Sequence, residues 1–497
     1  MEIEFPQPEP VAPARTPFKR LARDLIIYGS GRIAFQFLIF LSVPILTRVF
    51  TKSEFGVIET MATLSAALGV VVILGLDSAS QRSYFDYPEA DVESRRAVLG
   101  TSFWTLLLWG GLVAGAGALA SRPLAEALFG STRYTVVVAL AIGVLFLEQM
   151  FAFCQSIMRV RGQPVRFSIL SLIWAAATLG TMLALVALLD KGLRGYYLGF
   201  LLGGVAALGV ALVAVRDDIR PTFDRRELRI MLAYGLPLVP LAASTWILQL
   251  VDRFFLLHYA SVAEVGVYGI GARLANLLLL AVVTLGLAWT PFVFDLASRE
   301  PEEERAVRGR SLTYTAVLLG FGAVVVSVFA RELFVTVTDP KFEDAYKVVG
   351  LLAGSVVAIG LNAITTTGIS LERQTRYFAR YAVYVAVVNI ALNFALIPPY
   401  GMVGAALATF LTYALLSVLY YRRAQQLDPA PFDGAKVLTA LAVAAALIAV
   451  GTFVNLDPLW LSVLVKLPLV AAFPLAMIAL RVLDTEALAL LRRRAGA

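Results

Sequence analysis

Four charged residues interrupt long apolar stretches of the chain. Asp252 and Arg253 stand in "LQLVDRFFLL", Arg273 stands in "YGIGARLANLLLL", and Arg32 lies in apolar sequence near the N-terminus. A charged side chain at the centre of a membrane helix costs roughly 2.5–3.5 kcal/mol on insertion scales. Arginine also offers a planar fork of donors that pairs with phosphate oxygens. These residues therefore predict binding of an anion, such as a diphosphate, in a wet cavity.

Each intramembrane charge has a polar companion three or four positions away, and this spacing places both side chains on one helix face. Such a face is expected to line a cavity rather than lipid. The predicted anion-binding residues are Arg273, Arg32 and Arg253, and the predicted polar lining consists of Gln36, Gln249, Asp252 and Asn276.

Purely structural roles are open for Arg32, Asp252 and Arg253, whereas such a role fits Arg273 poorly. Arg273 lies about 13 Å into its expected helix at 1.5 Å per residue, where a side chain cannot easily reach the surface. Arg32 could pair with a neighbouring helix. Asp252 and Arg253 could form ion pairs at a helix end or extend to the headgroups.

Two further sets of charged residues could form a contact that opens and closes, or carry a proton. Asp77 and Arg82 lie at the end of the second apolar stretch, where they could form a gate or a static salt bridge. Glu148 stands inside the fourth apolar stretch and is a candidate for carrying a coupling proton.

Composition identifies an integral membrane protein. The 497 residues are 59% hydrophobic and 15% charged, with a mean hydropathy of +0.79, whereas soluble domains are about 25% charged. One cysteine, Cys154, and one histidine, His258, exclude a Cys/His zinc site. The chain has no G-x-x-x-x-G-K-[ST] motif for ATP hydrolysis. We expect no metal and no cofactor.

Apolar stretches of the length that a membrane helix needs, about 20 residues, occur fourteen times. The fold class expected is an all-α polytopic membrane protein. The stretches cover roughly 25–47, 55–76, 98–120, 134–156, 166–189, 195–215, 232–257, 264–293, 312–330, 346–370, 377–397, 402–421, 436–454 and 460–481.

Basic residues predict the orientation, because cytoplasmic loops are enriched in Lys and Arg. With the N-terminus inside, 29 of the 42 lysines and arginines fall in cytoplasmic segments, 9 in outside loops and 4 inside helices. Both termini are therefore expected in the cytoplasm. This asymmetry explains the net charge of +7 without a nucleic-acid partner.

The chain contains an internal repeat. Residues 54–57, Glu-Phe-Gly-Val, match residues 264–267, Glu-Val-Gly-Val, and "RVRGQPVRFSIL" from Arg159 matches "LERQTRYFARY" from Leu371. Helices 1–6 thus repeat as helices 7–12 in the same orientation, with a central cavity between the two lobes. The expected divisions are a disordered cytoplasmic tail (1–24), an N-lobe (25–215), a cytoplasmic linker (216–231), a C-lobe (232–421), two additional helices (436–481) and a cytoplasmic tail (482–497).

Several of these segments resemble the oligosaccharide and polysaccharide flippases of the MOP superfamily, which are related to the MATE exporters and the lipid II flippases. The similar segments are "YGSGRIAFQFLIFLSVPILTRVFTKSEFGVIE", "LGLDSASQRSYFDY", "VDRFFLLHYASVAEVGVYGIGARL" and "PYGMVGAALATF".

This resemblance implies a protein of the bacterial inner membrane that works as a monomer. It would flip an undecaprenyl-pyrophosphate-linked oligosaccharide from the cytoplasmic to the periplasmic leaflet by alternating access. The implied partners are this cargo, membrane lipid, and the polymerase and glycosyltransferases of the same pathway. The resemblance also implies an anion-binding role for Arg273.

Two other functions are open. A multidrug exporter of the same fold would carry a cation and should have an acidic cavity, whereas the recognised intramembrane charges are mainly arginines. A membrane polymerase or glycosyltransferase should have a sizeable outside loop with catalytic side chains, but the connecting segments are short.

Overall fold

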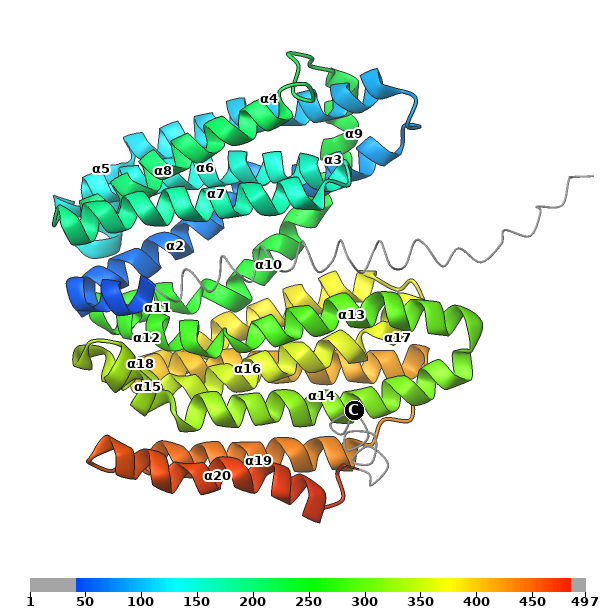
Figure 1. Cartoon of the computed structure of the whole chain (residues 1–497). Coiled ribbons are helices and arrows are strands. Elements are labelled where there is room, and N and C mark those ends of the chain that lie inside the picture. Colours follow the sequence, from blue (N-terminus) through cyan, green and yellow to red (C-terminus); the bar gives the residue numbers. More distant parts are fainter. Residues whose placement is uncertain (1–41, 484–497) are drawn as a thin grey trace, which may run out of the picture.

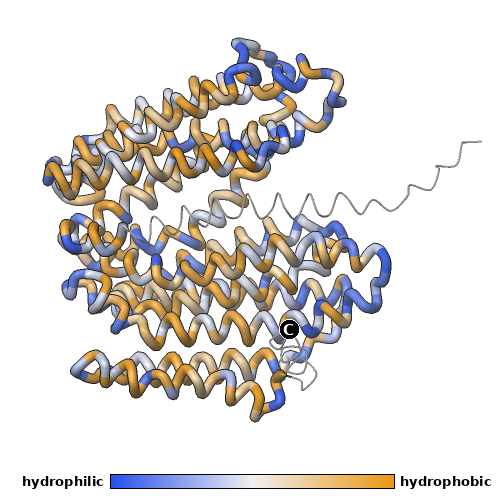
Figure 2. The backbone as a smooth tube through the Cα atoms, viewed as in Figure 1, coloured by the Kyte–Doolittle hydropathy of each residue, from blue (hydrophilic) through white to orange (hydrophobic). Residues whose placement is uncertain are grey.

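The computed structural model describes residues 42–483, and all structural statements below concern that part of the chain. Within it the regular elements are helices and no strand occurs, which confirms the expected all-α class. Figure 1 shows two stacked helix bundles and a helical segment that runs between them. Figure 2 shows apolar helix bodies with hydrophilic residues gathered at their ends, as expected of a polytopic membrane protein.

The first bundle contains α2 (Lys52–Ile73), α3 (Leu76–Phe85), α4 (Val92–Leu119), α5 (Ser121–Phe129), α6 (Thr135–Val160), α7 (Pro164–Leu183) and α8 (Gly192–Val215). The connecting segment contains α9 (Arg225–Gly235) and α10 (Val239–Leu250). The second bundle contains α11 (Asp252–Tyr259), α12 (Val262–Ala275), α13 (Leu278–Arg299), α14 (Pro301–Val328), α15 (Ala330–Val337), α16 (Tyr346–Thr365), α17 (Thr367–Leu371), α18 (Arg376–Leu427), α19 (Gly434–Phe453) and α20 (Leu459–Ala479).

Among the described residues, twelve helical segments are long and apolar enough to cross a membrane. The longest, α18, covers two of the expected spans, which meet at a kink where Gly401 has φ 52° and ψ −132°. Most of the expected first span, 25–47, lies outside the described residues, although residues 42–49 are helical. Fourteen spans and a complete six-helix repeat therefore stay predictions.

Two expected helices are broken. The stretch 232–257 is divided among α9, α10 and α11. The break between α9 and α10 lies at Pro237 and Pro240, which each lack the N–H that a continuous helix needs. The break between α10 and α11 lies at Val251. The stretch 264–293 is divided into α12 and α13. There Leu277 N–H donates to the Leu274 carbonyl at 3.2 Å, which is the tighter i→i+3 pattern of a 3₁₀ turn. Hydropathy does not detect such local changes.

The connecting segment belongs to both bundles. α9 packs on α3 and α4, whereas α10 packs mainly on α18. The break between α2 and α3 meets the break between α9 and α10, because a Cβ at Gly75 would lie 2.3 Å from the Gly235 carbonyl oxygen. Gly75 also has φ +71°, which favours glycine.

The last two helices are fixed to the second bundle by a buried ion pair. Lys466 on α20 lies 2.7 Å from Glu332 on α15, and the Ser462 hydroxyl donates to the same carboxylate oxygen at 2.5 Å. The Lys466 and Glu332 side chains are only 1% and 7% exposed. Such a charge is tolerated within an apolar helix because its partner neutralises it.

Replacement of Lys466 should test this attachment. Lys466→Leu leaves the Glu332 carboxylate buried without its cation, and we expect a loss of about 3 kcal/mol of stability. The measurement is denaturant unfolding in detergent micelles. Glu332→Gln added to Lys466→Leu should restore part of the loss. Lys347→Leu is the control, since its partner Asp344 is 50% exposed. Equal effects of the two lysine substitutions would contradict this assignment.

Candidate functional site

The two bundles are in closest contact where α2 packs against α12. A Cβ at Gly56 would lie 1.7 Å from the Val262 carbonyl oxygen, and a Cβ at Gly266 would lie 2.2 Å from the Lys52 carbonyl oxygen. No larger residue fits at either position without moving a helix. The contact is reciprocal, because the matching Glu-x-Gly-Val motifs of the two helices, 54–57 and 264–267, pack against each other.

An ion pair crosses this contact. Arg273 on α12 donates from Nε and Nη2 to Oε1 of Glu59 on α2, at 3.0 and 2.6 Å. Gly269 makes room for the carboxylate, since a Cβ there would lie 2.4 Å from Glu59 Cγ and Cδ. The Arg273 guanidinium also lies over the Phe55 ring, 5.2 Å from its centre. One helix face thus supplies both the close approach and the charge that bridges the bundles.

A second arginine extends the network into the second bundle. Arg253 Nε lies 3.6 Å from Glu59 Oε2, and its Nη1 donates to Asp252 Oδ1 at 3.0 Å. The other Asp252 oxygen accepts hydrogen bonds from the Tyr268 hydroxyl and, at 3.4 Å, from Thr409. Arg253 Nε has no hydrogen-bond partner among the described residues, so its contact with Glu59 is long and incomplete.

The network contains equal numbers of positive and negative groups. Glu59 and Asp252 balance Arg273 and Arg253, which lowers the cost of placing four charges at membrane depth. The Glu59, Asp252 and Arg253 side chains are at most 8% exposed, whereas Arg273 is 26% exposed. Arg273 is therefore the most exposed of these four charged side chains.

The structure brings three of the predicted site residues together, namely Arg273, Arg253 and Asp252. Gln249 and Asn276 are exposed; the Gln249 carbonyl accepts from Arg253 Nη1 at 3.1 Å, and Asn276 lies at the kink between α12 and α13. Arg32 and Gln36 lie outside the described residues. An anion-binding role for these residues stays a prediction.

Glu59 is the residue that sequence reasoning missed. It is the only charged residue in its apolar stretch, with no basic residue three or four positions away. The internal repeat could have indicated its neighbour. When the matched motifs are aligned, Glu59 corresponds to Gly269, which is the residue against which Glu59 packs.

The expected pairing of Asp77 with Arg82 is wrong. Asp77 lies 3.5 Å from Arg159 and accepts a hydrogen bond from Gln81 at 3.1 Å, whereas Arg82 lies over the Tyr234 ring, 4.6 Å from its centre. Positions five apart do not share a helix face, while three or four apart do. A gate role for either residue stays a prediction.

Asp77 borders a cavity of about 300 Å³ between the first bundle and the connecting segment. Its lining includes Gly69, Ser78 and Gln149 from the first bundle, and Leu238 and Ala242 from the connecting segment. Glu148, next to Gln149 on α6, is partly buried.

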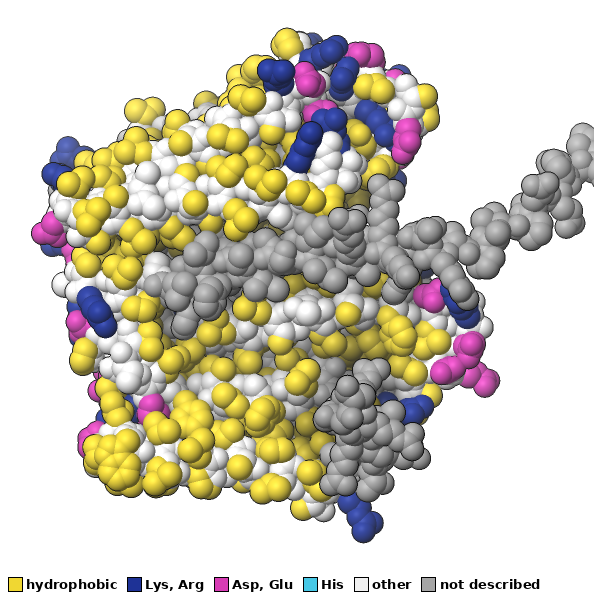
Figure 3. Space-filling view, viewed as in Figure 1, with side chains coloured by type: hydrophobic (Ala, Val, Ile, Leu, Met, Phe, Trp, Pro, Cys, Tyr) yellow, Lys and Arg dark blue, Asp and Glu magenta, His cyan; other side chains and the backbone are white. Residues whose placement is uncertain are grey.

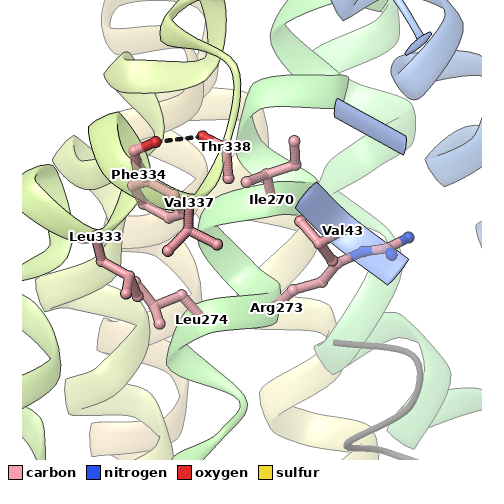
Figure 4. Close-up of a pocket in the computed structure, with 8 residues that line it drawn as sticks. All are labelled: Val43, Ile270, Arg273, Leu274, Leu333, Phe334, Val337 and Thr338. Atoms are coloured by element: carbon pink, nitrogen blue, oxygen red, sulfur yellow. Dashed lines mark hydrogen bonds between the residues drawn. The ribbon is translucent and has the colours of Figure 1, made fainter. Parts of the chain in front are cut away.

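Figure 4 shows a much smaller cavity beside Arg273. Its volume is about 10 Å³ and most of its lining is apolar, including Ile270, Leu274 and Leu333. The Arg273 guanidinium points away from these side chains. A space that holds at most one water molecule cannot receive a phosphate, so any ligand of Arg273 must approach from the guanidinium side.

Residues 45–347 match the family described as "Polysaccharide biosynthesis protein". The match covers more than half of the chain. The chain belongs to this family. This match confirms the expected kinship with proteins of polysaccharide biosynthesis.

The family assignment agrees with the similarity to known proteins. The chain is 28% identical over 159 residues to the "Probable low-salt glycan biosynthesis flippase Agl15" of Haloferax volcanii, and 27% identical over 217 residues to the "Probable flippase AglR" of the same organism. These matches cover 32% and 42% of this chain, and 34% and 44% of the two archaeal proteins. The chain therefore matches less than half the length of either relative.

The fold of this family member is similar to that of solved transporters. Lipid II flippase MurJ, in an inward closed conformation, superposes with a TM-score of 0.70 at 15% identity, over 92% of this chain and 99% of MurJ. A multidrug resistance MATE transporter of the MOP superfamily, in an inward-facing conformation, has a TM-score of 0.64 at 15% identity, over 80% and 97% of the two chains. These neighbours are transporters rather than enzymes.

A double-mutant cycle should measure the ion pair between the bundles. Glu59→Gln and Arg273→Gln each remove one charge of the same ion pair, so their effects should not add. We expect a coupling energy of about 1–3 kcal/mol in denaturant unfolding.

The control cycle is Asp295→Asn with Arg299→Gln. This pair has a similar separation of 2.9 Å but is 55% and 72% exposed, and its coupling should stay below about 0.5 kcal/mol. Additive effects of Glu59→Gln and Arg273→Gln would show that the bundles are not held by this pair.

Proposed function

We propose that this chain is a flippase that moves a lipid-linked glycan across a membrane by alternating access of its two bundles. The observation that carries the proposal is Arg273, a partly exposed cation of the second bundle that is held by a carboxylate of the first bundle. The family, the fold and the flippase names of the relatives support the same function. Transport then requires the contact between α2 and α12 to open and close.

The geometry suggests how cargo could open this contact. A diphosphate is a stronger and more highly charged partner for a guanidinium than one carboxylate. Both hydrogen bonds from Arg273 to Glu59 use one edge of the guanidinium, Nε and Nη2. Nη1 would then donate to a phosphate oxygen of the cargo. Binding there would draw Arg273 away from Glu59. The remaining contact of Glu59, with Arg253 at 3.6 Å, is weaker, so the bundles could separate at this end.

The cargo that we propose is an undecaprenyl-pyrophosphate-linked oligosaccharide, flipped from the cytoplasmic to the periplasmic leaflet of a bacterial inner membrane. The direction is the one that the resemblance to lipid-linked oligosaccharide flippases implies, and the asymmetry of basic residues supports an orientation with both termini in the cytoplasm. The N-lobe (25–215), the linker (216–231), the C-lobe (232–421) and the additional helices (436–481) are the divisions that we propose for this cycle. Arg32 and Gln36 would contribute to the same cavity.

A cation exporter is the second candidate, and one observation favours it. Glu59 and Asp252 make the network acidic as well as basic, and the MATE transporter shares the fold. The carboxylates, however, are buried and engaged by arginines, whereas the partly exposed member is Arg273. An accessible arginine fits an anionic cargo better.

Transport in reconstituted liposomes tests the proposal. The assay follows a fluorescent undecaprenyl-pyrophosphate oligosaccharide, after each variant is shown to fold and insert. Arg273→Gln should lower the rate at least tenfold, because it removes a charge-assisted bond worth about 1.5–3 kcal/mol. Arg273→Lys should give an intermediate rate, since lysine keeps the charge without the planar fork.

Arg299→Gln is the matched control, because Arg299 is exposed and pairs only with exposed Asp295 among the described residues. It should transport like the unmodified protein. Full activity of Arg273→Gln would remove the anion site. Failure of the unmodified protein to move the lipid, with uptake of cationic dyes instead, would favour the exporter.

Glu148 is the residue that we propose for proton coupling. It is partly buried on α6, and no ion pair holds it among the described residues. Glu148→Gln cannot release a proton, so stimulation of transport by a pH gradient should disappear while transport without a gradient remains. The check is the same liposome assay with and without an imposed gradient. Persistent stimulation in the variant would assign coupling elsewhere.

A further inference from the structure

Helix α9 presents three arginines on one exposed face. Arg225 and Arg229 are four positions apart, and Arg226 and Arg229 are three apart, so the three side chains share a face. All three are exposed. In the described part of the chain, the ion pairs next to this helix involve Arg216 and Arg220 instead. Figure 3 shows Lys and Arg gathered at this end of the first bundle, above an apolar lateral surface.

The opposite face of α9 is fixed to the first bundle. Glu227 accepts a hydrogen bond from the Tyr87 hydroxyl at 2.6 Å, and Met231 is buried against Ser102 of α4. Asp224 caps the helix by accepting from the backbone N–H groups of Arg226 and Glu227. The acidic groups nearest to the arginines are therefore already engaged, and the basic face is held outward.

Apolar side chains are exposed beside the arginines. Phe223, Ile230 and Tyr234 are 51%, 45% and 37% exposed. Arg82 of α3 lies over the Tyr234 ring and is also exposed. Through a short 3₁₀ turn, α9 continues into α10 within one candidate membrane span, Arg225–Leu250. Arginines next to exposed apolar side chains, at the end of a span, are typical of a helix that lies at a membrane surface.

We propose that this surface, the α9 basic face, consisting of Arg225, Arg226 and Arg229 together with Arg82, binds the phosphate groups of anionic phospholipids. The guanidinium groups would pair with headgroup phosphates while Phe223 and Ile230 enter the acyl boundary. A soluble phosphate or a nucleic acid would use the arginines but not the apolar side chains, so a lipid is the partner that fits both. The proposal does not depend on the cargo.

Bound lipid would have a specific consequence for the fold. α9 packs on the first bundle and α10 on the second, so lipids on α9 hold one end of the connecting segment at the membrane surface. The bilayer would thereby fix α9, and α10 would move relative to it together with the second bundle.

Native mass spectrometry of the full-length protein in detergent tests the proposal. The probes are phosphatidylglycerol and phosphatidylcholine with identical acyl chains. The unmodified protein should retain several-fold more phosphatidylglycerol. Arg225→Gln/Arg226→Gln/Arg229→Gln should weaken its retention at least tenfold, since each arginine near the surface contributes roughly fivefold. The corresponding triple lysine variant should retain most of the binding, which keeps the test valid if the glutamine variant does not fold.

The matched control is Arg310→Gln/Arg380→Gln/Arg422→Gln, which removes the same charge from exposed positions of the second bundle. It should retain phosphatidylglycerol like the unmodified protein. Three results would overturn the proposal: equal retention of the two lipids, equal losses in both glutamine variants, or displacement of phosphatidylglycerol by free pyrophosphate at equal concentration. The last result would identify a soluble phosphate site rather than a lipid surface.

Discussion

The close contact between α2 and α12 is the constraint on which the rest of the structure depends. Gly56, Gly266 and Gly269 lie where any side chain would overlap the opposite helix or Glu59. The helices can therefore approach closely enough for Arg273 and Glu59 to meet. Without that approach, Glu59 and Arg273 would lose each other as counter-charges in an apolar environment, which is costly, whereas Arg253 would keep Asp252. The close packing of α2 on α12 and the ion pair between Glu59 and Arg273 therefore depend on each other.

The remaining helices are attached to the two bundles in two different ways. α19 and α20 are fixed to the second bundle through Lys466 and Glu332, so they should move with it as a rigid body. The α9–α10 segment is different, because its two helices pack on different bundles and are joined by a proline-containing turn. A relative motion of the bundles must therefore be absorbed at Leu236–Leu238 and at the facing break between α2 and α3.

The sequence predicted those properties that depend on many residues at once, and it missed those that depend on one tertiary contact. Apolar length predicted the helical class and most helix positions. The companions that spacing predicted, Gln249 and Asn276, are exposed, whereas the arginines pair with Asp252 and Glu59. Glu59 could not be found in this way, because its partners come from another helix. The predicted partner of Asp77, Arg82, was wrong for the same reason, because the observed partner, Arg159, is close in space but distant in the chain. The kink at Asn276 depends on backbone hydrogen bonds that hydropathy does not detect.

The balance of charges at the site links cargo binding to opening. If the arginines were unpaired, an anion would bind them without changing the contact between the bundles. Because Glu59 already occupies Arg273, an anion gains a full partner only by weakening that ion pair. Cargo binding at Arg273 then competes with the ion pair that joins α12 to α2. A neutral network at membrane depth is therefore consistent with an anionic cargo, and it gives the carboxylate a function that a simple basic cavity would lack.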